Sequence, residues 1–462
     1  MRRVLLFLLA AFAVFDASAQ ILAGPMLGPV SMRSAGVWIA LEKPGSTAQV
    51  KYWAKGADKS KARDAWRINA SSNEGAPYNI QSFTLTDLEP GTTYEYEVSV
   101  TDKNATNACS AAISKGEVAT QQLFQWRRNA PDFTFLTGSC AYFNQPQYDR
   151  PGKPYGLDSS IFETMAKEKA SFMLWLGDNW YTREVDYSSE WGLWYRAMHD
   201  RSQPILKDFW KAMPHLAIWD DHDFGPNDYG KSYLLKNTSR DVFNAMWMNP
   251  SSGEYNEGIY TRHTYSDVDF FMLDDRWWRD FDRLPDSVNG KPNEQKRMYG
   301  KRQLEWLKNE LRYSKTNPYI SFRIIVTGSQ VLNPGSPFDK LLDFPVEYNE
   351  LIHFIREEKI DGVVFLTGDR HHSEVIKVQH EGLYPLYDIT CSPLTSGTHP
   401  FGGKEANNPW RVVGVDKLQN FGRISISGPR SSRTLKVEFA GLKGEKLAEW
   451  QVGEQELRVK TK

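Results

Sequence analysis

Cysteine is scarce in this chain, which has only Cys109, Cys140 and Cys391 among its 462 residues. A chain of this length can bury large cores, so its stability does not depend on a disulfide framework. An odd number of cysteines also leaves at least one of them unpaired or bound to a ligand. Whether Cys109 and Cys391 form a disulfide stays open at this point.

The sequence also lacks an excess of charge of either sign. Its 56 lysines and arginines nearly balance its 57 aspartates and glutamates. There is therefore no overall basic field of the kind that holds nucleic acid or an anionic membrane, and we find no nucleic-acid-binding signature. Aromatic residues make up 13% of the chain. Because they do not gather on a basic strip, they suit a core or a pocket lining better than a base-stacking platform.

Long apolar runs are absent beyond the first residues. The basic pair Arg2-Arg3 precedes an apolar run over residues 4–15, and Ala-Ser-Ala follows at residues 17–19 as a small-residue cleavage pattern. This order predicts a signal peptide over residues 1–19. The apolar run is too short to span a bilayer, and no later segment is long enough. We therefore expect a secreted or periplasmic protein without a transmembrane anchor.

Residues 20–125 show the pattern of a β-sandwich, with apolar and polar residues alternating between turn signals. A Pro90-Gly91 turn leads into a strand that begins near Tyr94. The hydroxyl of such a tyrosine can bend back onto the backbone, as in the tyrosine corner of sandwich domains. The segment resembles a fibronectin type III-like module. We expect no chemistry in it, and its partner is unknown.

After a connection over residues 121–129, the pattern changes, and residues 130–462 are predicted to form a second, larger domain. Helices are expected over residues 158–169, 301–313 and 348–358, and strands over residues 171–176, 321–326 and 362–366. Such alternation predicts an α/β domain with buried sheets. The strands after about residue 421 are expected to complete a sheet of this domain. In such folds, ligands bind at the carboxyl ends of the strands.

Polar side chains stand at the ends of four predicted strands. They are, in chain order, Cys140; Asp178 and Tyr181; Asp221, His222 and Asn227; and Asp369 and His371. Each alone has a simpler interpretation, such as a buried apolar cysteine or a hydrogen-bonded core histidine. Together, thiol, phenol, amide, carboxylate and imidazole groups at four strand ends favour a polynuclear metal site.

The same motifs form an ordered set along the chain. They are Gly138-Ser139-Cys140, Gly177-Asp178-Asn179-Trp180-Tyr181, Trp219-Asp220-Asp221-His222-Asp223, Leu273-Asp274-Asp275-Arg276, Gly300-Lys301-Arg302-Gln303-Leu304-Glu305-Trp306-Leu307, Gly328-Ser329-Gln330-Val331 and Gly368-Asp369-Arg370-His371. The set resembles the PhoD-type alkaline phosphatases, a branch of the calcineurin-like metallophosphoesterases, over roughly residues 130–400. The resemblance implies an α/β fold, a two-sheet αββα sandwich preceded by the fibronectin type III-like β-sandwich.

The resemblance also implies a set of metal ligands. They are Cys140, Asp178, Tyr181, Asp221, Asn227, Asp369 and His371. Cys140 and Tyr181 would bind a ferric ion, with Asp178 bridging towards a neighbouring site. Thiolate and phenolate ligands favour Fe3+. The companion metal of the family is calcium, which suits the oxygen ligands of the remaining set. Zn2+ and Mn2+ stay open as alternatives.

Three further residues would act on the substrate. His222 would contact the phosphate or protonate the leaving alkoxide. Arg183 and Arg370 would pair with phosphate oxygens. Arg276 is a further candidate for this contact, but it could equally form a salt bridge with the acids of the site. The resemblance implies a hydrolase of phosphoric esters that works by attack of a metal-activated water or hydroxide, and the predicted signal peptide implies that it is exported.

Three functions remain in competition. The first is a phosphomonoesterase acting on a small phosphate ester. The second is a phosphodiesterase or phospholipase-like enzyme, which would cleave a lipid or another diester at the same site. The third is an envelope binding protein in which the metal site is only structural. His222 beside Asp221 argues against the third, because a purely structural site needs no additional imidazole.

Overall fold

The computed structural model describes residues 21–68, 75–102 and 112–459. The predicted signal peptide and Cys109 lie outside these ranges, so the signal peptide stays a prediction. Cys391 is a buried free thiol. Within the three ranges, no helix has both the length and the apolar character that a bilayer crossing requires.

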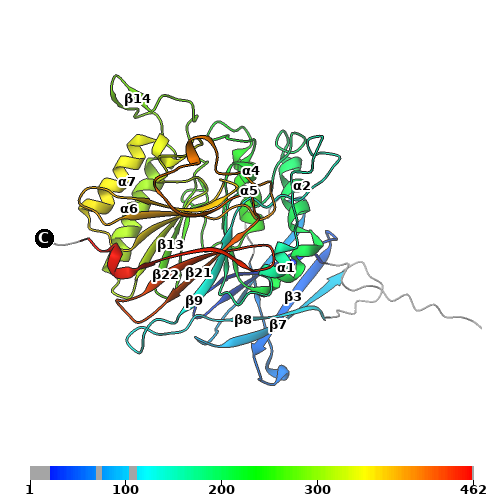
Figure 1. Ribbon diagram of the computed structural model, residues 1–462. Helices are drawn as coiled ribbons and strands as arrows, with labels where there is room; N and C mark the ends of the chain where they lie inside the picture. Colours follow the sequence, from blue (N-terminus) through cyan, green and yellow to red (C-terminus); the bar gives the residue numbers. More distant parts are fainter. Residues whose placement is uncertain (1–20, 69–74, 103–111, 460–462) are drawn as a thin grey trace, which may run out of the picture.

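The N-terminal part consists of two antiparallel sheets in the described residues (Figure 1, blue to cyan). The first sheet comprises, in spatial order, β1 (Ile21–Val30), β2 (Ala35–Leu41), β6 (Asn79–Leu85) and β5 (Trp66–Ile68). The second comprises β4 (Arg63–Asp64), β3 (Ser46–Ala54), β7 (Thr93–Asp102) and β8 (Ala112–Ala119). The two sheets enclose their own apolar cluster, which includes Val37, Val50, Phe83 and Val98.

Alternation of buried and accessible residues is seen in the second sheet, whereas β2 of the first sheet is buried throughout. Along β3, buried residues alternate with exposed ones over most of the strand, as expected when one face of a strand packs inward. The predicted tyrosine corner is confirmed, because the Tyr94 hydroxyl accepts a hydrogen bond of 2.9 Å from the backbone N–H of Glu89. The assignment to the fibronectin type III class stays a prediction.

Two larger sheets form the centre of the molecule. One comprises β11 (His215–Ile218), β10 (Met173–Leu176), β9 (Phe133–Gly138), β21 (Phe421–Ser427), β22 (Thr434–Ala440) and β23 (Lys446–Gly453). The other comprises β12 (Thr261–Tyr265), β13 (Val268–Met272), β16 (Phe322–Val326), β17 (Val363–Thr367), β19 (Leu386–Thr390), β18 (Ser373–Val378) and β20 (Arg411–Val415). A separate hairpin joins β14 (Ser287–Val288) and β15 (Lys291–Pro292).

The central strands of both sheets run parallel. In one sheet β9, β10 and β11 are parallel, and in the other β13, β16, β17 and β19 are parallel. Every residue of β10, β13, β16 and β17 is buried, which fits the continuous apolar runs of strands covered on both faces. The sheets pack face to face. Phe135 of β9 meets Phe270 of β13 edge to face, with ring centroids 5.2 Å apart.

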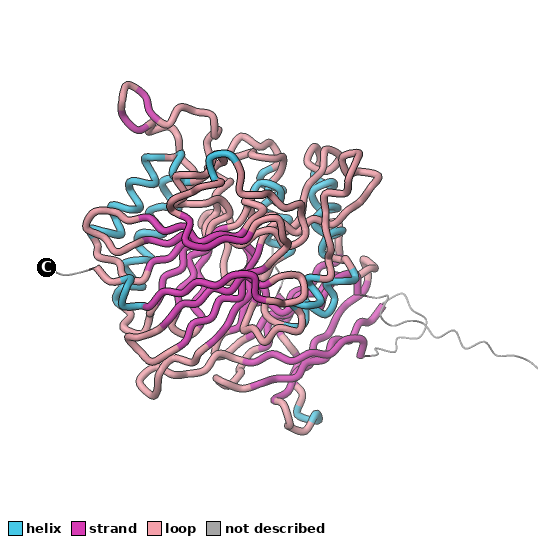
Figure 2. Tube along the Cα trace, in the orientation of Figure 1, coloured by secondary structure: helices cyan, strands magenta, loops and turns pink. Residues whose placement is uncertain are grey.

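Helices cover the outer sides of these sheets, and the strands run through the interior (Figure 2). The helices are α1 (Ile161–Met165), α2 (Glu190–Arg201), α3 (Lys207–Ala212), α4 (Asp221–Phe224), α5 (Lys236–Met246), α6 (Gly300–Thr316) and α7 (Pro345–Glu357). The rings of Phe162 in α1 and Phe209 in α3 each lie 5.9 Å from that of Trp175 in β10. On the other side, Ser314 of α6 donates a hydrogen bond of 2.6 Å to Asp269 of β13.

The mixed α/β architecture and the role of the tail are confirmed. β21 and β22 follow residue 420, and β21 pairs with β9, so the C-terminal strands do complete a central sheet. The helix expected over residues 158–169 is shorter, since only Ile161–Met165 is helical. The chain must leave the helix early because Ser171 N–H already donates to the Thr134 carbonyl of β9. The division into domains at 20–125 and 130–462 stays a prediction.

Candidate metal centre

The backbone turns sharply where the strands deliver the predicted ligands. Cys140 has φ 63°, Asp178 has φ 51°, Asp369 has φ 66° and His371 has φ 56°. Non-glycine residues rarely adopt this left-handed conformation, and it persists where the surrounding structure enforces it. β9, β10 and β17 end just before these residues. The same unusual turn at three strand ends directs side chains from both sheets towards one region.

Two glycines allow these strand ends to approach closely. A Cβ atom on Gly328, which follows β16, would lie 2.6 Å from Cγ of Asp220. A Cβ atom on Gly177, which follows β10 and has φ +92°, would lie 2.6 Å from Cβ of Asp220. Real Cβ contacts are longer than this, so only glycine leaves room for Asp220. The two sheets are thereby brought together at their carboxyl ends.

The first group of possible ligands contains sulfur, oxygen and nitrogen. Ligand atoms of Cys140, Asp178 and His371 all lie within 4.8 Å of one another, and Cys140 Sγ is 3.6 Å from Asp178 Oδ2. The Tyr181 hydroxyl is 3.3 Å from His371 Nε2. His371 Nδ1 donates a hydrogen bond of 2.6 Å to the Gly397 carbonyl. Since that bond takes the proton of Nδ1, the lone pair of Nε2 faces the group.

The second group is dominated by carboxylates. Ligand atoms of Asp178, Asp221 and His222 lie within 4.8 Å of one another, and so do those of Asp220, Asp221 and Asp369. Asp178 therefore belongs to both the sulfur-containing group and the carboxylate group. The ring of His222 lies 4.1 Å from that of Tyr181, and its Nδ1 is buried without a hydrogen-bond partner in the described chain.

Burial and mutual repulsion make Asp178, Asp369 and Cys140 difficult to ionise when no cation is bound near them. Burial, together with the charges of Asp221 and Cys140, raises the pKa of Asp178 well above its usual value. Burial and Asp339 raise the pKa of Asp369 to about 7, and burial with Asp369 raises the pKa of the Cys140 thiol to about 11. Cations would reverse these shifts. The donor chemistry and the unpartnered Nδ1 of His222 thus fit bound metal ions.

The pKa of Asp221 shifts in the opposite direction from those of Asp178 and Asp369. Burial opposes its ionisation, but His222 and Arg276 outweigh burial and hold the pKa of Asp221 below its usual value. Arg276 is 1% exposed and pairs with Asp220, and its Nη2 lies 3.4 Å from Asp339 Oδ2. Arg276 therefore acts as a salt-bridge partner of the acids.

Sequence reasoning missed two of these acids as members of the site. Asp220 stands beside the predicted ligand Asp221 in the same motif, and Asp339 comes from a loop after β16 that carries no recognisable pattern. Asp339 also pairs with Arg279 at 2.5 Å. The adjacent carboxylates of the Asp220-Asp221 pair were the one signal that could have singled out Asp220.

Arg183 and Arg370 are both held by internal partners. Arg183 Nε donates to Asp149 at 3.1 Å, and its guanidinium lies over the Tyr142 ring at 4.0 Å. Arg370 donates to both carboxylate oxygens of Glu405, at 2.9 and 3.0 Å. Contact with a phosphate would require either arginine to exchange or share these partners.

The predicted ligand Asn227 and Gln330 of the Gly328-Ser329-Gln330-Val331 motif differ in their availability to a ligand. Asn227 is exposed in the loop that follows α4. Gln330 donates to Glu374 at 2.8 Å and to Thr390 at 2.9 Å, so its amide belongs to a buried polar network. Asn227 thus remains available to a ligand, whereas the amide of Gln330 is occupied.

A cavity of about 410 Å³ opens beside this centre. Its lining combines tyrosines, His222, Asn227 and several charged side chains. The lining residues are Tyr142, Asp149, Arg150, Pro151, Lys153, Tyr155, Tyr181, Thr182, Arg183, Glu184, Tyr187, His222, Pro226 and Asn227. A molecule in this cavity would reach Tyr181 and His222 directly, so the centre is accessible to a ligand.

Two families of known proteins match this chain, and together they cover most of its residues. The PhoD-like phosphatase family matches residues 135–425, and a domain of unknown function (DUF7800) matches residues 18–116. Alkaline phosphatase D of Bacillus subtilis (strain 168) is 26% identical over an alignment of 285 residues that covers 53% of this chain and 47% of that protein. The match thus spans about half the length of this curated relative.

Two solved structures share the fold. A structure of PhoD is 17% identical, has a TM-score of 0.72, and aligns over 97% of this chain and 92% of its own. The purple acid phosphatase PPD1 from yellow lupin (Lupinus luteus) seeds is 13% identical, has a TM-score of 0.66, and aligns over 93% of this chain and 74% of its own. Since the family match covers more than half of the residues, the chain belongs to the PhoD-like phosphatase family, as the order of its motifs predicted.

Proposed function

We propose that the protein is an exported, metal-dependent phosphoesterase that hydrolyses phosphate esters at the centre around Asp178. The main support is the position of Asp178, which is shared between a thiol-containing group and a carboxylate group. A shared carboxylate is what two neighbouring metal ions need as a bridge. Membership of the PhoD-like phosphatase family points to the same class of reaction. The signal-peptide pattern of residues 1–19 supports export.

The ligands divide by chemistry. Cys140, Tyr181 and His371, together with Asp178, would hold Fe3+, because thiolate and phenolate favour it. Asp221, Asp369 and Asn227, with Asp178, would hold Ca2+ through oxygen, and Zn2+ or Mn2+ are the alternatives. Metals bound there would neutralise charge on the phosphate oxygens and lower the pKa of the attacking water.

The protein's own residues would orient the reaction. The Gly397 carbonyl fixes the ring of His371. His222 lies against Tyr181 and lines the cavity, where it would deliver a proton to the leaving oxygen of the ester. Tyr142, Tyr155 and Tyr187 would surround the organic group of the substrate. Arg183 would hold the Tyr181 segment in place through its bond to the Tyr181 carbonyl.

An assay with two synthetic esters tests this proposal. The purified protein, loaded with Fe3+ and Ca2+, is expected to release the phenol from an aryl phosphate, from a bis-aryl phosphate, or from both. The ratio of kcat/KM for the two esters would separate a monoesterase from a diesterase. Inactivity towards both esters at every metal combination would contradict a phosphoesterase.

The cavity favours a diester as the second candidate. A phosphate alone would leave most of its 410 Å³ unfilled. Arg150 and Lys153 stand exposed at its edge, and they could contact a further anionic group of a longer substrate. We therefore propose phosphodiester or phospholipase-like hydrolysis as the alternative on the same site.

Replacing His222 with alanine is expected to lower kcat about 10²–10⁴-fold, the usual contribution of a positioned acid or base. The metal content, measured by elemental analysis, is expected to stay close to that of the unchanged protein. His353→Ala is the matched control, because the side chain of His353 is 63% exposed on α7. Activity equal to that of the control would remove the role proposed for His222.

The visible spectrum of the iron-loaded protein tests the iron ligands. Phenolate or thiolate bound to Fe3+ absorbs visible light, so we expect a coloured protein whose band shifts or is lost in Tyr181→Phe. Tyr142→Phe is the control, since the Tyr142 ring lies 5.0 Å from that of Tyr181 while its hydroxyl donates to Asp149. A colourless, fully active protein that contains only zinc, manganese or calcium would contradict the iron assignment.

We also propose the division of the chain that the sequence predicts, with a fibronectin type III-like unit over residues 20–125 and a catalytic unit over residues 130–462. The separate apolar cluster of the N-terminal sheets supports it. The pairing of β21 with β9 supports inclusion of the C-terminal strands in the catalytic unit.

A further inference from the structure

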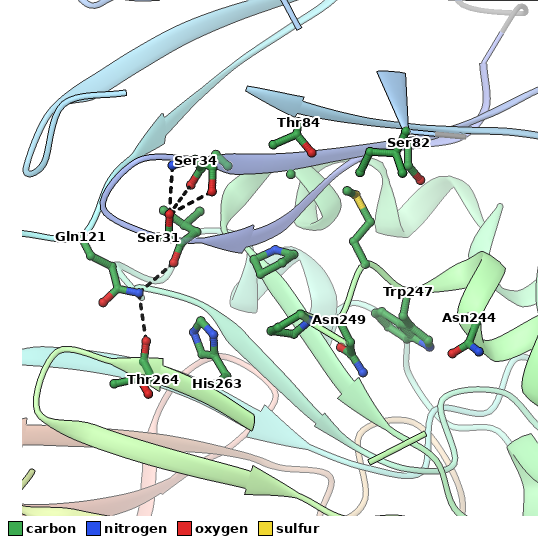
Figure 3. Close-up of a pocket in the computed structure, with 17 residues that line it drawn as sticks. Ser31, Ser34, Ser82, Thr84, Gln121, Asn244, Trp247, Asn249, His263 and Thr264 are labelled. Atoms are coloured by element: carbon green, nitrogen blue, oxygen red, sulfur yellow. Dashed lines mark hydrogen bonds between the residues drawn. The ribbon is translucent and has the colours of Figure 1, made fainter. Parts of the chain in front are cut away.

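A second cavity, of about 480 Å³, lies between the N-terminal sheets and the larger part of the chain (Figure 3). Ser82 and Thr84 of β6 line one side, and Asn244, Trp247 and His263 line the other. The cavity shares none of its described lining residues with the cavity beside Asp178. It is therefore a separate site, and what it binds does not depend on the proposed phosphoesterase function.

Among the described residues, the lining carries no Asp, Glu, Lys or Arg side chain. The 17 lining residues are Pro29, Val30, Ser31, Ser34, Ala35, Gly36, Ile68, Ser82, Thr84, Gln121, Asn244, Trp247, Met248, Asn249, Pro250, His263 and Thr264. In the whole sequence, 24% of residues are charged. Burial lowers the pKa of His263 to about 4, so its ring is neutral as well. An ion in this cavity would lose hydration without gaining a partner of opposite charge.

Several polar groups of the lining lack partners. As whole residues, Ser82, Trp247 and His263 are 8%, 4% and 7% exposed. Within the described ranges, the Ser82 hydroxyl and the His263 ring make no hydrogen bond, and Trp247 Nε1 is buried without a partner. A fully buried polar atom such as Trp247 Nε1 is normally hydrogen-bonded, whereas the polar atoms of Ser82 and His263 are free to meet a ligand in the cavity. The hydroxyl and the imidazole can each both donate and accept, so a ligand with hydroxyl groups would satisfy them.

Apolar surfaces complete the lining. Pro29, Pro250, Met248 and Trp247 contribute carbon surface to the same cavity. A molecule that carries hydroxyl groups around a ring of C–H bonds would match this mixture of hydroxyl, amide, imidazole and apolar surface. The volume of the cavity, about 480 Å³, also lies within the range of about 300–1,000 Å³ found for small-molecule sites.

Gln121 fixes one end of the cavity. Its Nε2 donates to the Val30 carbonyl at 2.8 Å and to the Thr264 carbonyl at 3.1 Å, and its Oε1 accepts from Ser266 N–H at 3.1 Å. Figure 3 shows Gln121 between the two walls. Because one side chain ties strand β1 to the hairpin of β12 and β13, the walls hold their spacing and a ligand would meet a preformed site.

We propose that this cavity binds a neutral saccharide, of one or two rings, between the N-terminal sandwich and the catalytic part. Hydroxyl groups of the sugar would bond to Ser82, Thr84 and His263. The C–H faces of its rings would lie on the proline and tryptophan surfaces. The sandwich would thereby recognise a glycan close to the site of ester hydrolysis.

Titration of the full chain with sugars tests the proposal. The probes are D-glucose, D-galactose, N-acetyl-D-glucosamine and cellobiose, and their charged counterparts are D-glucuronate and D-glucosamine. Binding is followed by saturation-transfer NMR and calorimetry. At least one neutral probe is expected to bind with a Kd of about 1 mM or lower, and each charged counterpart at least tenfold more weakly. Absence of binding by all four neutral probes, or equal binding of the charged ones, would overturn the proposal.

Variants locate the binding. Ser82→Ala, Thr84→Val and His263→Phe each remove polar atoms while nearly keeping the shape, and each is expected to raise the Kd several-fold, with a combined effect of about tenfold or more (1.4 kcal/mol). Ser99→Ala is the control, because Ser99 lies on β7 in the other sheet of the sandwich. Thermal unfolding confirms that each variant is folded. Sugar binding that Ser82→Ala and Thr84→Val both leave unchanged would place the sugar elsewhere and contradict this assignment.

Discussion

Replacing Arg276 with methionine is expected to destabilise the metal-free protein by about 3–5 kcal/mol, the usual effect of breaking a buried ion pair by removing one partner. The side chains of Arg276 and Asp220 are 1% and 0% exposed and form a salt bridge. Asp221 and Asp339 lie within 4.0 Å of the same guanidinium. Without Arg276, Asp220 would stay buried without its counter-charge, whereas Asp339 would keep its pair with Arg279. Chemical denaturation, followed by circular dichroism, measures the change.

Two comparisons test whether the loss of stability comes from burial of the ion pair. Arg33→Met removes the ion pair between Arg33 and Glu89, whose side chains are 61% and 67% exposed, and should cost no more than about 1 kcal/mol. In the double variant Asp220→Asn and Arg276→Met, the loss should be smaller than the sum of the two single losses, because the pair acts as a unit. If Arg276→Met were no more harmful than Arg33→Met, the ion pair would not stabilise the centre.

The Asp178→Asn variant is expected to lose about 10³-fold or more in kcat, together with most of both metals. The carboxylate of Asp178 lies in the group with Cys140 and His371 and also in the group with Asp221 and His222. Metals contribute several kcal/mol to such transition states, and a loss of about 4 kcal/mol corresponds to roughly 10³-fold in rate. Elemental analysis and the aryl phosphate assay on the same preparation measure both quantities.

Asp369→Asn provides a graded comparison. Asp369 belongs to one of the two groups that contain Asp221, so its variant should retain more of the iron than Asp178→Asn does. Asp282→Asn is the control, because the Asp282 carboxylate pairs with Arg279 outside these groups. Full retention of both metals in Asp178→Asn would mean that Asp178 does not bridge them.

The convergence of the candidate ligand residues could be predicted because it depends on local sequence and a general rule. Cys140, Asp178 and Asp369 each follow a short apolar run, and such runs form buried parallel strands. The carboxyl ends of parallel strands share one edge, so residues far apart in the chain meet there. The position of α6 was predictable for a similar reason, because Leu304, Leu307 and Leu311 recur at helical spacing.

Other features depend on contacts that no local pattern encodes. The partner of Arg370 is Glu405, and that of Arg183 is Asp149; both pairs join separate loops. Helix α5 was not predicted because its inward face includes Ser239 and Arg240, which interrupt the apolar period. Ser239 is accommodated there through its hydrogen bond to the Phe224 carbonyl. In these cases, tertiary partners determine what the segment can form.

The left-handed backbone at Cys140, Asp178 and Asp369 limits how this centre can diversify during evolution. Asparagine and aspartate adopt that conformation more readily than other side chains, and β-branched residues adopt it only with strain. Exchange of Cys140 for aspartate or asparagine would keep the turn and replace the sulfur of the group with oxygen, beside the imidazole of His371. Exchange of Cys140 for threonine or valine would remove the sulfur and would also strain the left-handed turn of the backbone. Descendants of this protein could therefore shift metal preference by a single substitution along only a few routes.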